Sequence, residues 1–171
     1  MNIFLLGDVP NDLVSFTFFI GTMAMMAASV FFFLSLDAGG GKWRTSMLVS
    51  GLITFIAAVH YYYMRDANVA GADTTFFRYV DWILTVPLMC VEFYLLTKLA
   101  GAKKSLLWKL ILASTWMLVC GYIGEAFVTE QPIEAQRGWS VQWGVLSTLG
   151  YLYIAYTVWF GEVANLAEAS K

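Results

Sequence analysis

Residues 78–96 read RYVDWILTVPLMCVEFYLL, an apolar stretch that contains an arginine, an aspartate and a glutamate. A helix of about 20 such residues crosses the hydrocarbon core of a bilayer. Ionisable side chains at that depth cost about 3 kcal/mol or more each, so they are rare and usually functional. The stretch therefore predicts a membrane-spanning helix that carries a polar site.

The whole chain has the composition of a membrane protein. Its 171 residues are 60% hydrophobic and 13% charged, whereas soluble domains carry about 25% charged residues. The net charge of −2 argues against nucleic acid as a partner. Cys90 and Cys120 both lie in apolar runs, so we expect buried core residues and no metal site.

Five apolar segments are long enough to span a bilayer, and they cover residues 13–36, 43–64, 76–99, 105–128 and 139–160. Turn-forming residues mark the connections, which read DAGGGK at 37–42, RDANVAGADT at 65–74, AGAKK at 100–104 and TEQPIEAQRG at 129–138. Short connections favour antiparallel neighbours. The sequence thus predicts an all-α membrane protein, an up-down bundle of five transmembrane helices in a single domain over residues 1–171.

Basic residues are concentrated in the first and third connections and beside them, at Lys42, Arg44, Lys98, Lys103, Lys104 and Lys109. The second and fourth connections hold only Arg65 and Arg137, with acids nearby. By the positive-inside rule the first and third connections face the cytoplasm and the N-terminus faces outside. The tail GEVANLAEASK is predicted to be a polar linker.

Two carboxyls of the third segment are placed for proton transfer. Asp81 and Glu92 are separated by about 16 Å along a helix and by close to three turns, so they share a face with Thr85. Asp81 lies near Arg78 in the outer half, which favours its ionised form, whereas Glu92 is isolated, which favours its neutral form. Such a pair acts as acceptor and donor, with an outward direction of transfer. Alternatively, Arg78 and Asp81 form a buried pair that only fixes helix packing, which would leave Glu92 unexplained.

His60 is the one histidine of the chain and lies in the second segment. Its depth matches that of Asp81, so we expect the two side chains to be in contact. A histidine there could tune the acid or carry protons. The alternative is a histidine that only hydrogen-bonds a neighbouring helix.

The stretch at 78–96 strongly resembles the third helix of microbial rhodopsins of the proteorhodopsin and xanthorhodopsin type. The resemblance continues in VHYYYMR at 59–65, MLVCGYIGEA at 117–126 and STLGYLYIAYTVWFGE at 147–162, and it covers essentially the whole chain. It implies a seven-helix bundle around all-trans retinal, which is bound as a Schiff base to a lysine of the seventh helix.

The resemblance also implies roles for the polar residues. Asp81 would be the counterion and primary proton acceptor, Glu92 the cytoplasmic proton donor, and Thr85 the middle residue of the motif. Arg78 would lie below the counterion and help proton release, and His60 would partner the counterion. This pattern implies a light-driven outward proton pump, not an enzyme, and disfavours sodium and chloride pumps. Glu125 is a candidate for proton release or for an interface cap.

The retinal pocket is implied in the same way. Trp82 would pack on the polyene, and Met89 matches a colour-tuning position where an apolar residue implies green absorption. The remaining expected pocket residues are Met117, Gly121, Trp143 and Ser147. Ordinary packing is the alternative for each of them.

Gly144 falls where many of these rhodopsins carry a bulky aromatic beside the retinal ring. In xanthorhodopsin-like members a glycine there opens a window for a carotenoid antenna, so the resemblance implies a bound carotenoid. The alternative is a glycine that lets two helices approach closely.

The sequence departs from the family in lacking the sixth and seventh helices and any mid-membrane lysine. We expect it to be the first part of a longer rhodopsin; a truncated product is the alternative. Two other function classes stay open: a sensory photoreceptor that signals to a partner, which Glu92 disfavours, and a retinal-free scaffolding fragment. The resemblance further implies a multi-pass protein of the bacterial inner membrane, in contact with lipids and assembled as a homo-oligomer, with a pentamer favoured.

Overall fold

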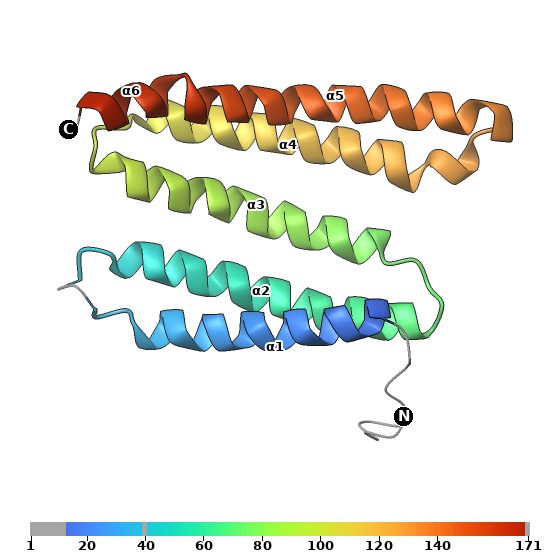
Figure 1. The fold of residues 1–171 in the computed structure, drawn as a ribbon, viewed down its shortest axis with the longest axis horizontal. Helices are drawn as coiled ribbons and strands as arrows, with labels where there is room; N and C mark the ends of the chain where they lie inside the picture. Colours follow the sequence, from blue (N-terminus) through green and yellow to red (C-terminus); the bar gives the residue numbers. More distant parts are fainter. Residues whose placement is uncertain (1–12, 39–40, 170–171) are drawn as a thin grey trace.

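The computed structural model describes residues 13–38 and 41–169. Five long helices lie side by side and alternate in direction (Figure 1), and the described part of the chain contains no strand. The elements are α1 (Leu13–Leu34), α2 (Arg44–Val69), α3 (Thr75–Lys98), α4 (Lys104–Ala126), the 3₁₀ turn η1 (Val128–Glu130), α5 (Ile133–Trp159) and α6 (Glu162–Ala169). The predicted all-α, up-down bundle is confirmed.

Four of these helices, α1 to α4, are long and apolar enough to cross a membrane. Helix α5 has 27 residues but is not among the four, because its first turns are polar and its tyrosines and tryptophans lower its mean hydropathy. Its place beside α4 (Figure 1) fits the predicted fifth span. That fifth crossing stays a prediction.

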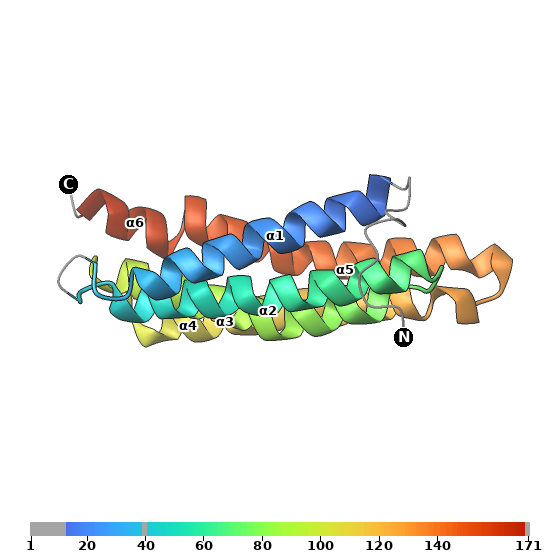
Figure 2. The ribbon, with the colours of Figure 1, turned by 90° about the horizontal axis from the view of Figure 1, so that it is seen from below.

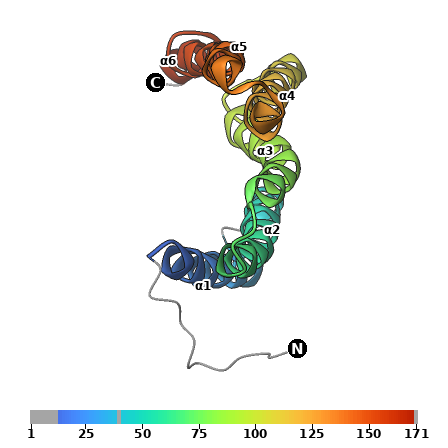
Figure 3. The ribbon, with the colours of Figure 1, turned by 90° about the vertical axis from the view of Figure 1, so that its right-hand side faces the viewer.

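The five long helices form one curved layer. Seen end-on, they follow an arc with α1 at one end and α5 at the other (Figure 3), and they share one long axis in the perpendicular view (Figure 2). The main contacts join sequence neighbours: α1 with α2, α2 with α3, α3 with α4, and α4 with α5. Each interior helix therefore presents one side to the helix before it and another to the helix after it.

Two predicted connections are shorter in the structure. Helix α2 continues to Val69, although its predicted end is residue 64, and α5 begins at Ile133, although its predicted start is residue 139. Hydropathy detects only the lipid-embedded part of a helix, whereas the helical hydrogen bonds continue into water. The real stop signal of α2 is Gly71, whose φ of 69° closes a left-handed C-terminal cap.

The predicted polar linker after residue 160 is wrong, because residues 162–169 form helix α6. Val163 and Leu166, three residues apart, put two apolar side chains on one side of this short helix. They pack against a buried cluster at the ends of α3 and α4, formed by Cys90, Tyr94, Ala102, Leu106 and Leu110. The ammonium of Lys109 also lies 3.1 Å from the Glu162 carboxylate.

Both cysteines behave as core residues. Cys90 and Cys120 are buried, and neither forms a disulfide. The Cys90 sulfur lies 3.6 Å from the Ser114 hydroxyl, a contact that joins α3 to α4. Their predicted role in packing is confirmed.

Candidate functional site

The two carboxyls of α3 both have partners on α2. Asp81 is buried, with only 4% of its surface exposed, and Glu92 is half-buried. Asp81 lies near His60, and Glu92 contacts Ser50. Thr85 is also buried and donates its hydroxyl to the backbone carbonyl of Asp81 at 2.9 Å. The predicted common face of these three residues is thus the face that meets α2.

His60 and Asp81 are in contact, as predicted from their depths. The distance from His60 Nδ1 to Asp81 Oδ1 is 3.7 Å, too long for a hydrogen bond. The same Nδ1 lies 2.9 Å from the Ile56 carbonyl. A carbonyl can only accept, so Nδ1 carries a hydrogen and donates it to Ile56. Asp81 Oδ1 is consequently a buried carboxylate oxygen with no hydrogen-bond partner in the described part of the chain.

Glu92 has a partner that the sequence analysis did not identify. The Ser50 hydroxyl lies 3.0 Å from the Ser46 carbonyl and also contacts Glu92 Oε1. A hydroxyl has one hydrogen to donate. The two contacts can both be full hydrogen bonds when Ser50 donates to Ser46 and a protonated Glu92 donates to Ser50. The geometry therefore suits a carboxyl that holds a proton.

Arg78 does not form the buried pair with Asp81 that the sequence left open. Its Nη2 pairs with the Glu125 carboxylate of α4 and donates to the Thr75 hydroxyl at 3.2 Å. The guanidinium carbon lies 5.7 Å from the centre of the Trp82 ring, within the range of a cation–π contact. Arg78 thus bridges α3 and α4.

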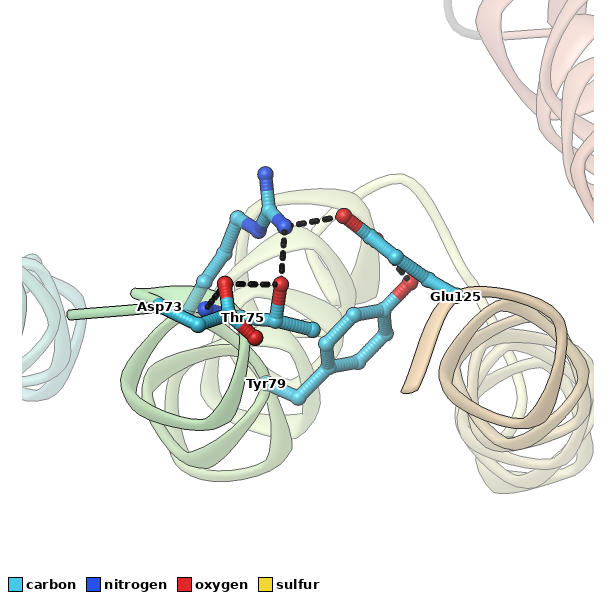
Figure 4. Close-up of polar contacts among 5 residues, drawn as sticks. Asp73, Thr75, Tyr79 and Glu125 are labelled. Carbon is cyan, nitrogen blue, oxygen red and sulfur yellow. Dashed lines mark hydrogen bonds and ion pairs between the residues drawn. The ribbon is translucent and has the colours of Figure 1, made fainter. Parts of the chain in front are cut away.

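Arg78 belongs to a group that we call the arginine cluster: Asp73, Thr75, Arg78, Tyr79 and Glu125. Figure 4 shows the Tyr79 hydroxyl directed at Glu125, to which it donates at 3.1 Å. Asp73 Oδ1 accepts from the Thr75 amide at 3.0 Å and from the Thr75 hydroxyl at 2.8 Å. Asp73 precedes the membrane-spanning part of α3, and these two hydrogen bonds hold its pKa below the ordinary value. The cluster ties the start of α3 to the end of α4.

The expected pocket residues of α3 are accessible in this chain. Trp82 is 37% exposed and Met89 is 55% exposed. Trp82 packs edge-on against the Tyr79 ring, with the ring centres 5.1 Å apart. Both side chains offer apolar surface that these helices leave uncovered.

Three other expected pocket residues meet where α4 packs on α5. The Ser147 hydroxyl donates to the Met117 carbonyl at 2.8 Å. A Cβ on Gly121 would lie 3.0 Å from the Tyr79 hydroxyl and 3.6 Å from the Ser147 hydroxyl. The absent side chain of Gly121 therefore makes room for the tyrosine that holds Glu125.

Trp143 and Gly144 are neighbours in α5 but differ in packing. A Cβ on Gly124 would lie 2.7 Å from the Trp143 Cβ, so this tryptophan is seated on a glycine of α4. A Cβ on Gly144 would meet no atom within 4 Å, and the residue is exposed. Gly144 is thus not required for the close approach of α4 and α5.

The described lysines all lie near helix ends. Lys42 precedes α2, Lys98 ends α3, Lys103 and Lys104 start α4, and Lys109 follows in the second turn of α4. Two features of α3 are suited to retinal: Asp81 has a buried carboxylate oxygen with no hydrogen-bond partner among the described residues, and the ring of Trp82 is partly exposed. That combination suits a cation attached to an apolar polyene.

The family of bacteriorhodopsin-like proteins matches residues 12–171. The chain belongs to this family. The chain is 41% identical over 162 residues to the green-light absorbing proteorhodopsin of Gamma-proteobacterium EBAC31A08, and the match covers 91% of this chain and 60% of that protein. It is 43% identical over 159 residues to the blue-light absorbing proteorhodopsin of Gamma-proteobacterium Hot 75m4, with the same coverage.

Solved structures show the same fold. Xanthorhodopsin, described as a light-driven ion pump with dual chromophore, is 34% identical with a TM-score of 0.73, and the match covers 86% of this rhodopsin and 63% of that chain. Exiguobacterium sibiricum rhodopsin is 30% identical with a TM-score of 0.75, covering 91% and 66%. The chain spans about 60% of the length of the proteorhodopsins it matches. It is a rhodopsin-family membrane protein with several spans.

Proposed function

We propose that the protein to which these helices belong is a light-driven outward proton pump that binds all-trans retinal, and therefore a transporter, not an enzyme. The observation that carries the proposal is the pair of carboxyls on one face of α3. Asp81 has a free buried oxygen near His60, whereas Glu92 is hydrogen-bonded to Ser50. Two carboxyls in such different surroundings can hold opposite protonation states at one pH.

Bound retinal would supply light-driven isomerisation and a protonated nitrogen that gives up its proton. Asp81 would receive that proton on its unpartnered oxygen, and the imidazole of His60 would steady the carboxyl. Trp82 and Met89 would hold the polyene. The cluster of Met117, Gly121 and Ser147 between α4 and α5, together with Trp143, would hold the ring end.

Glu92 would return a proton from the cytoplasmic side. Its separation from Asp81 by about 16 Å of helix requires a path that opens during turnover. The hydrogen bond to Ser50 would keep its proton in place until then. Thr85, between the two carboxyls, donates its hydroxyl to the Asp81 carbonyl.

We further propose that the N-terminus faces outside the bacterial inner membrane. The basic residues support this orientation, because Lys98, Lys103 and Lys104 lie at one end of the bundle and the arginine cluster lies at the other. The protein would contact membrane lipids and form a homo-oligomer, with a pentamer favoured by the family resemblance. The retinal lysine would lie outside the present sequence.

A carotenoid antenna is a finer part of the proposal. The open space at Gly144 and the dual chromophore of xanthorhodopsin support it. Adding a hydroxylated or keto carotenoid should produce a new band in the excitation spectrum of pumping, and Gly144→Trp should remove that band. No new band, or a band that survives Gly144→Trp, would count against the antenna.

The pump is tested by light-induced pH change in cells that express the complete gene with retinal. We expect acidification outside that disappears with a protonophore, and its loss in Asp81→Asn. Glu92→Gln should slow recovery of the pigment, whereas Glu130→Gln, a matched change in the exposed η1 turn, should not. A pigment without acidification would favour the sensory photoreceptor, and absence of pigment would favour a retinal-free protein.

A further inference from the structure

One carboxylate, Asp81, lies three residues from Arg78 in the same helix, and another, Glu125, contacts Arg78 from α4. Opposite charges three residues apart in a helix usually pair. Arg78 nevertheless pairs with Glu125 on α4, whereas the Asp81 carboxyl faces the His60 imidazole of α2 at 3.7 Å. The side chains of Arg78 and Asp81 are therefore directed to different neighbours of α3, the first to α4 and the second to α2.

Several contacts hold the guanidinium in this position. Nη2 donates to both Glu125 and Thr75, and Asp73 in turn accepts from the Thr75 hydroxyl. Glu125 itself is held by the Tyr79 hydroxyl through its other oxygen (Figure 4). Releasing Arg78 requires breaking its bond to a carboxylate, which is the strongest kind of hydrogen bond available to it.

The separation of Arg78 from Asp81 leaves buried polar atoms unused. Arg78 Nε and Asp81 Oδ1 are both buried without a hydrogen-bond partner among the described residues. Opposite charges at close range attract strongly where water is scarce. This pair does not form, and the carboxylate in contact with Arg78 is Glu125.

We propose that Glu125 is a positioning residue that keeps Arg78 on the α4 side of α3 and thereby leaves the Asp81 carboxylate without an arginine partner. This inference rests on the proposed function, in which Asp81 accepts the proton. Without Arg78 beside it, the Asp81 carboxylate binds a proton more readily than it would with the arginine as a partner. Glu125 thus sets the proton affinity of the acceptor through Arg78, with His60 as the group that faces Asp81 from α2.

The test is an acid titration of the purified retinal pigment, followed by its visible absorption in darkness. Protonation of the carboxyl beside a cationic chromophore moves the absorption to the red, so the midpoint pH reports on Asp81. Glu125→Gln should lower this midpoint by about one pH unit or more, because the freed Arg78 stabilises the carboxylate. Glu130→Gln removes the same charge from η1 without releasing Arg78 and should leave the midpoint close to that of the parent.

A double-mutant cycle separates positioning from the direct field of Glu125. In the Arg78→Gln background, Glu125→Gln should no longer lower the midpoint, because there is no arginine to release. An equal drop in both backgrounds would mean that Glu125 acts only by its own charge, and the inference would be overturned. Glu125→Asp keeps the charge on a shorter side chain, so its midpoint should lie between those of the parent and Glu125→Gln. If the glutamine variant does not fold, a drop of the midpoint in Glu125→Asp is the test of the positioning role.

The outcomes also separate this inference from the proposed function. A parent protein that forms no pigment contradicts retinal binding itself. A parent pigment whose midpoint is the same as in Glu125→Gln and Glu125→Asp contradicts only the positioning role.

Discussion

The hydroxyl of Ser50 on α2 lies between two oxygen groups, the Ser46 carbonyl of its own helix and the Glu92 carboxyl of α3. Ser50 has one hydroxyl hydrogen for two contacts, so two full hydrogen bonds form when the Glu92 carboxyl supplies the second hydrogen. It also shows that α2 contributes to both carboxyl sites, through His60 at one and Ser50 at the other.

Replacing Ser50 by alanine should leave the Glu92 proton without its acceptor. We expect the carboxylic C=O stretch of Glu92, identified by its loss in Glu92→Gln, to move to higher frequency in the infrared spectrum of the dark state. Loss of a partner for a buried polar group costs about 1–3 kcal/mol. Because Glu92 is half-buried, we expect Ser50→Ala to lower the free energy of unfolding by an amount at the lower end of this range. Thr54→Val is the control, because Thr54 donates to backbone carbonyls of α2. If Glu92→Gln removes no such band, Glu92 is ionised and our assignment of the hydrogens is wrong.

Asp73 should make the stability of the protein depend on pH in the acid range. Its folded pKa is below the ordinary value of 3.8 because the Thr75 amide and hydroxyl donate to the carboxylate. A lowered pKa means that the ionised form stabilises the fold above the ordinary value, and that this contribution is lost as the pH falls through the folded pKa. Asp73→Asn should therefore unfold at a lower temperature than the parent at pH 6, and the difference should shrink as the pH falls below 3.8 and through the folded pKa.

The matched control for this titration is Asp66→Asn, which changes an exposed aspartate of α2. The difference in unfolding temperature between Asp66→Asn and the parent should not show the same dependence on pH. Asp73→Ala, which also removes the acceptor at acid pH, should cost about 1 kcal/mol at neutral pH, as loss of a helix-start cap does. A difference between the parent and Asp73→Asn that stays constant from pH 6 to the most acidic pH at which the parent is folded would contradict the hydrogen-bond explanation.

Two glycines of α5 should respond oppositely to alanine. A Cβ on Gly150 would lie 2.9 Å from the Ala113 carbonyl oxygen and 3.1 Å from the Met117 Cβ, atoms that cannot move without shifting α4. Gly150→Ala should therefore destabilise the protein by about 1–3 kcal/mol. At Gly138 nothing lies within 4 Å of a Cβ, so Gly138→Ala should be neutral or stabilise by up to about 1 kcal/mol. Denaturation in detergent measures both, and a tolerated Gly150→Ala would contradict the close contact.

The docking of helix α6 should depend more on its apolar contacts than on its ion pair. Lys109 and Glu162 are 48% and 28% exposed, and exposed ion pairs contribute about 0–1 kcal/mol. Glu162→Gln should leave α6 docked, whereas Leu166→Asp should release it from the cluster at the ends of α3 and α4. Limited proteolysis within residues 160–169 measures the difference. Equal protection in Leu166→Asp and the parent would show that another contact holds the helix.

Much of this arrangement could be predicted from the sequence, because it depends on properties of single segments. Hydropathy located the five long helices, and their short connections fixed their alternation. Helical spacing placed Asp81, Thr85 and Glu92 on one face, and equal depth matched His60 to Asp81. The ends of the helices were less predictable, because α2 and α5 continue past the apolar residues that hydropathy detects.

The partners across helices could not be predicted in the same way. Whether Arg78 pairs with Asp81 or Glu125 depends on how α3 is rotated against α4, and spacing within one helix contains no such information. The same holds for Ser50, whose signal in the sequence was only a pair of serines four residues apart in an apolar span. Pairings of this kind follow from the packing of two helices, with Gly121 providing the space for Tyr79.

The curved layer, in which the main contacts join consecutive helices, has a consequence for how the protein is made. Helices that insert into a membrane one after another can dock on the helix that has just preceded them, without waiting for a distant partner. Contacts between near sequence neighbours also form quickly, because little chain must be closed into a loop. The layer can therefore assemble in the order of its synthesis, and the α3–α4 bridge of Arg78 and Glu125 can be in place before α5 leaves the ribosome.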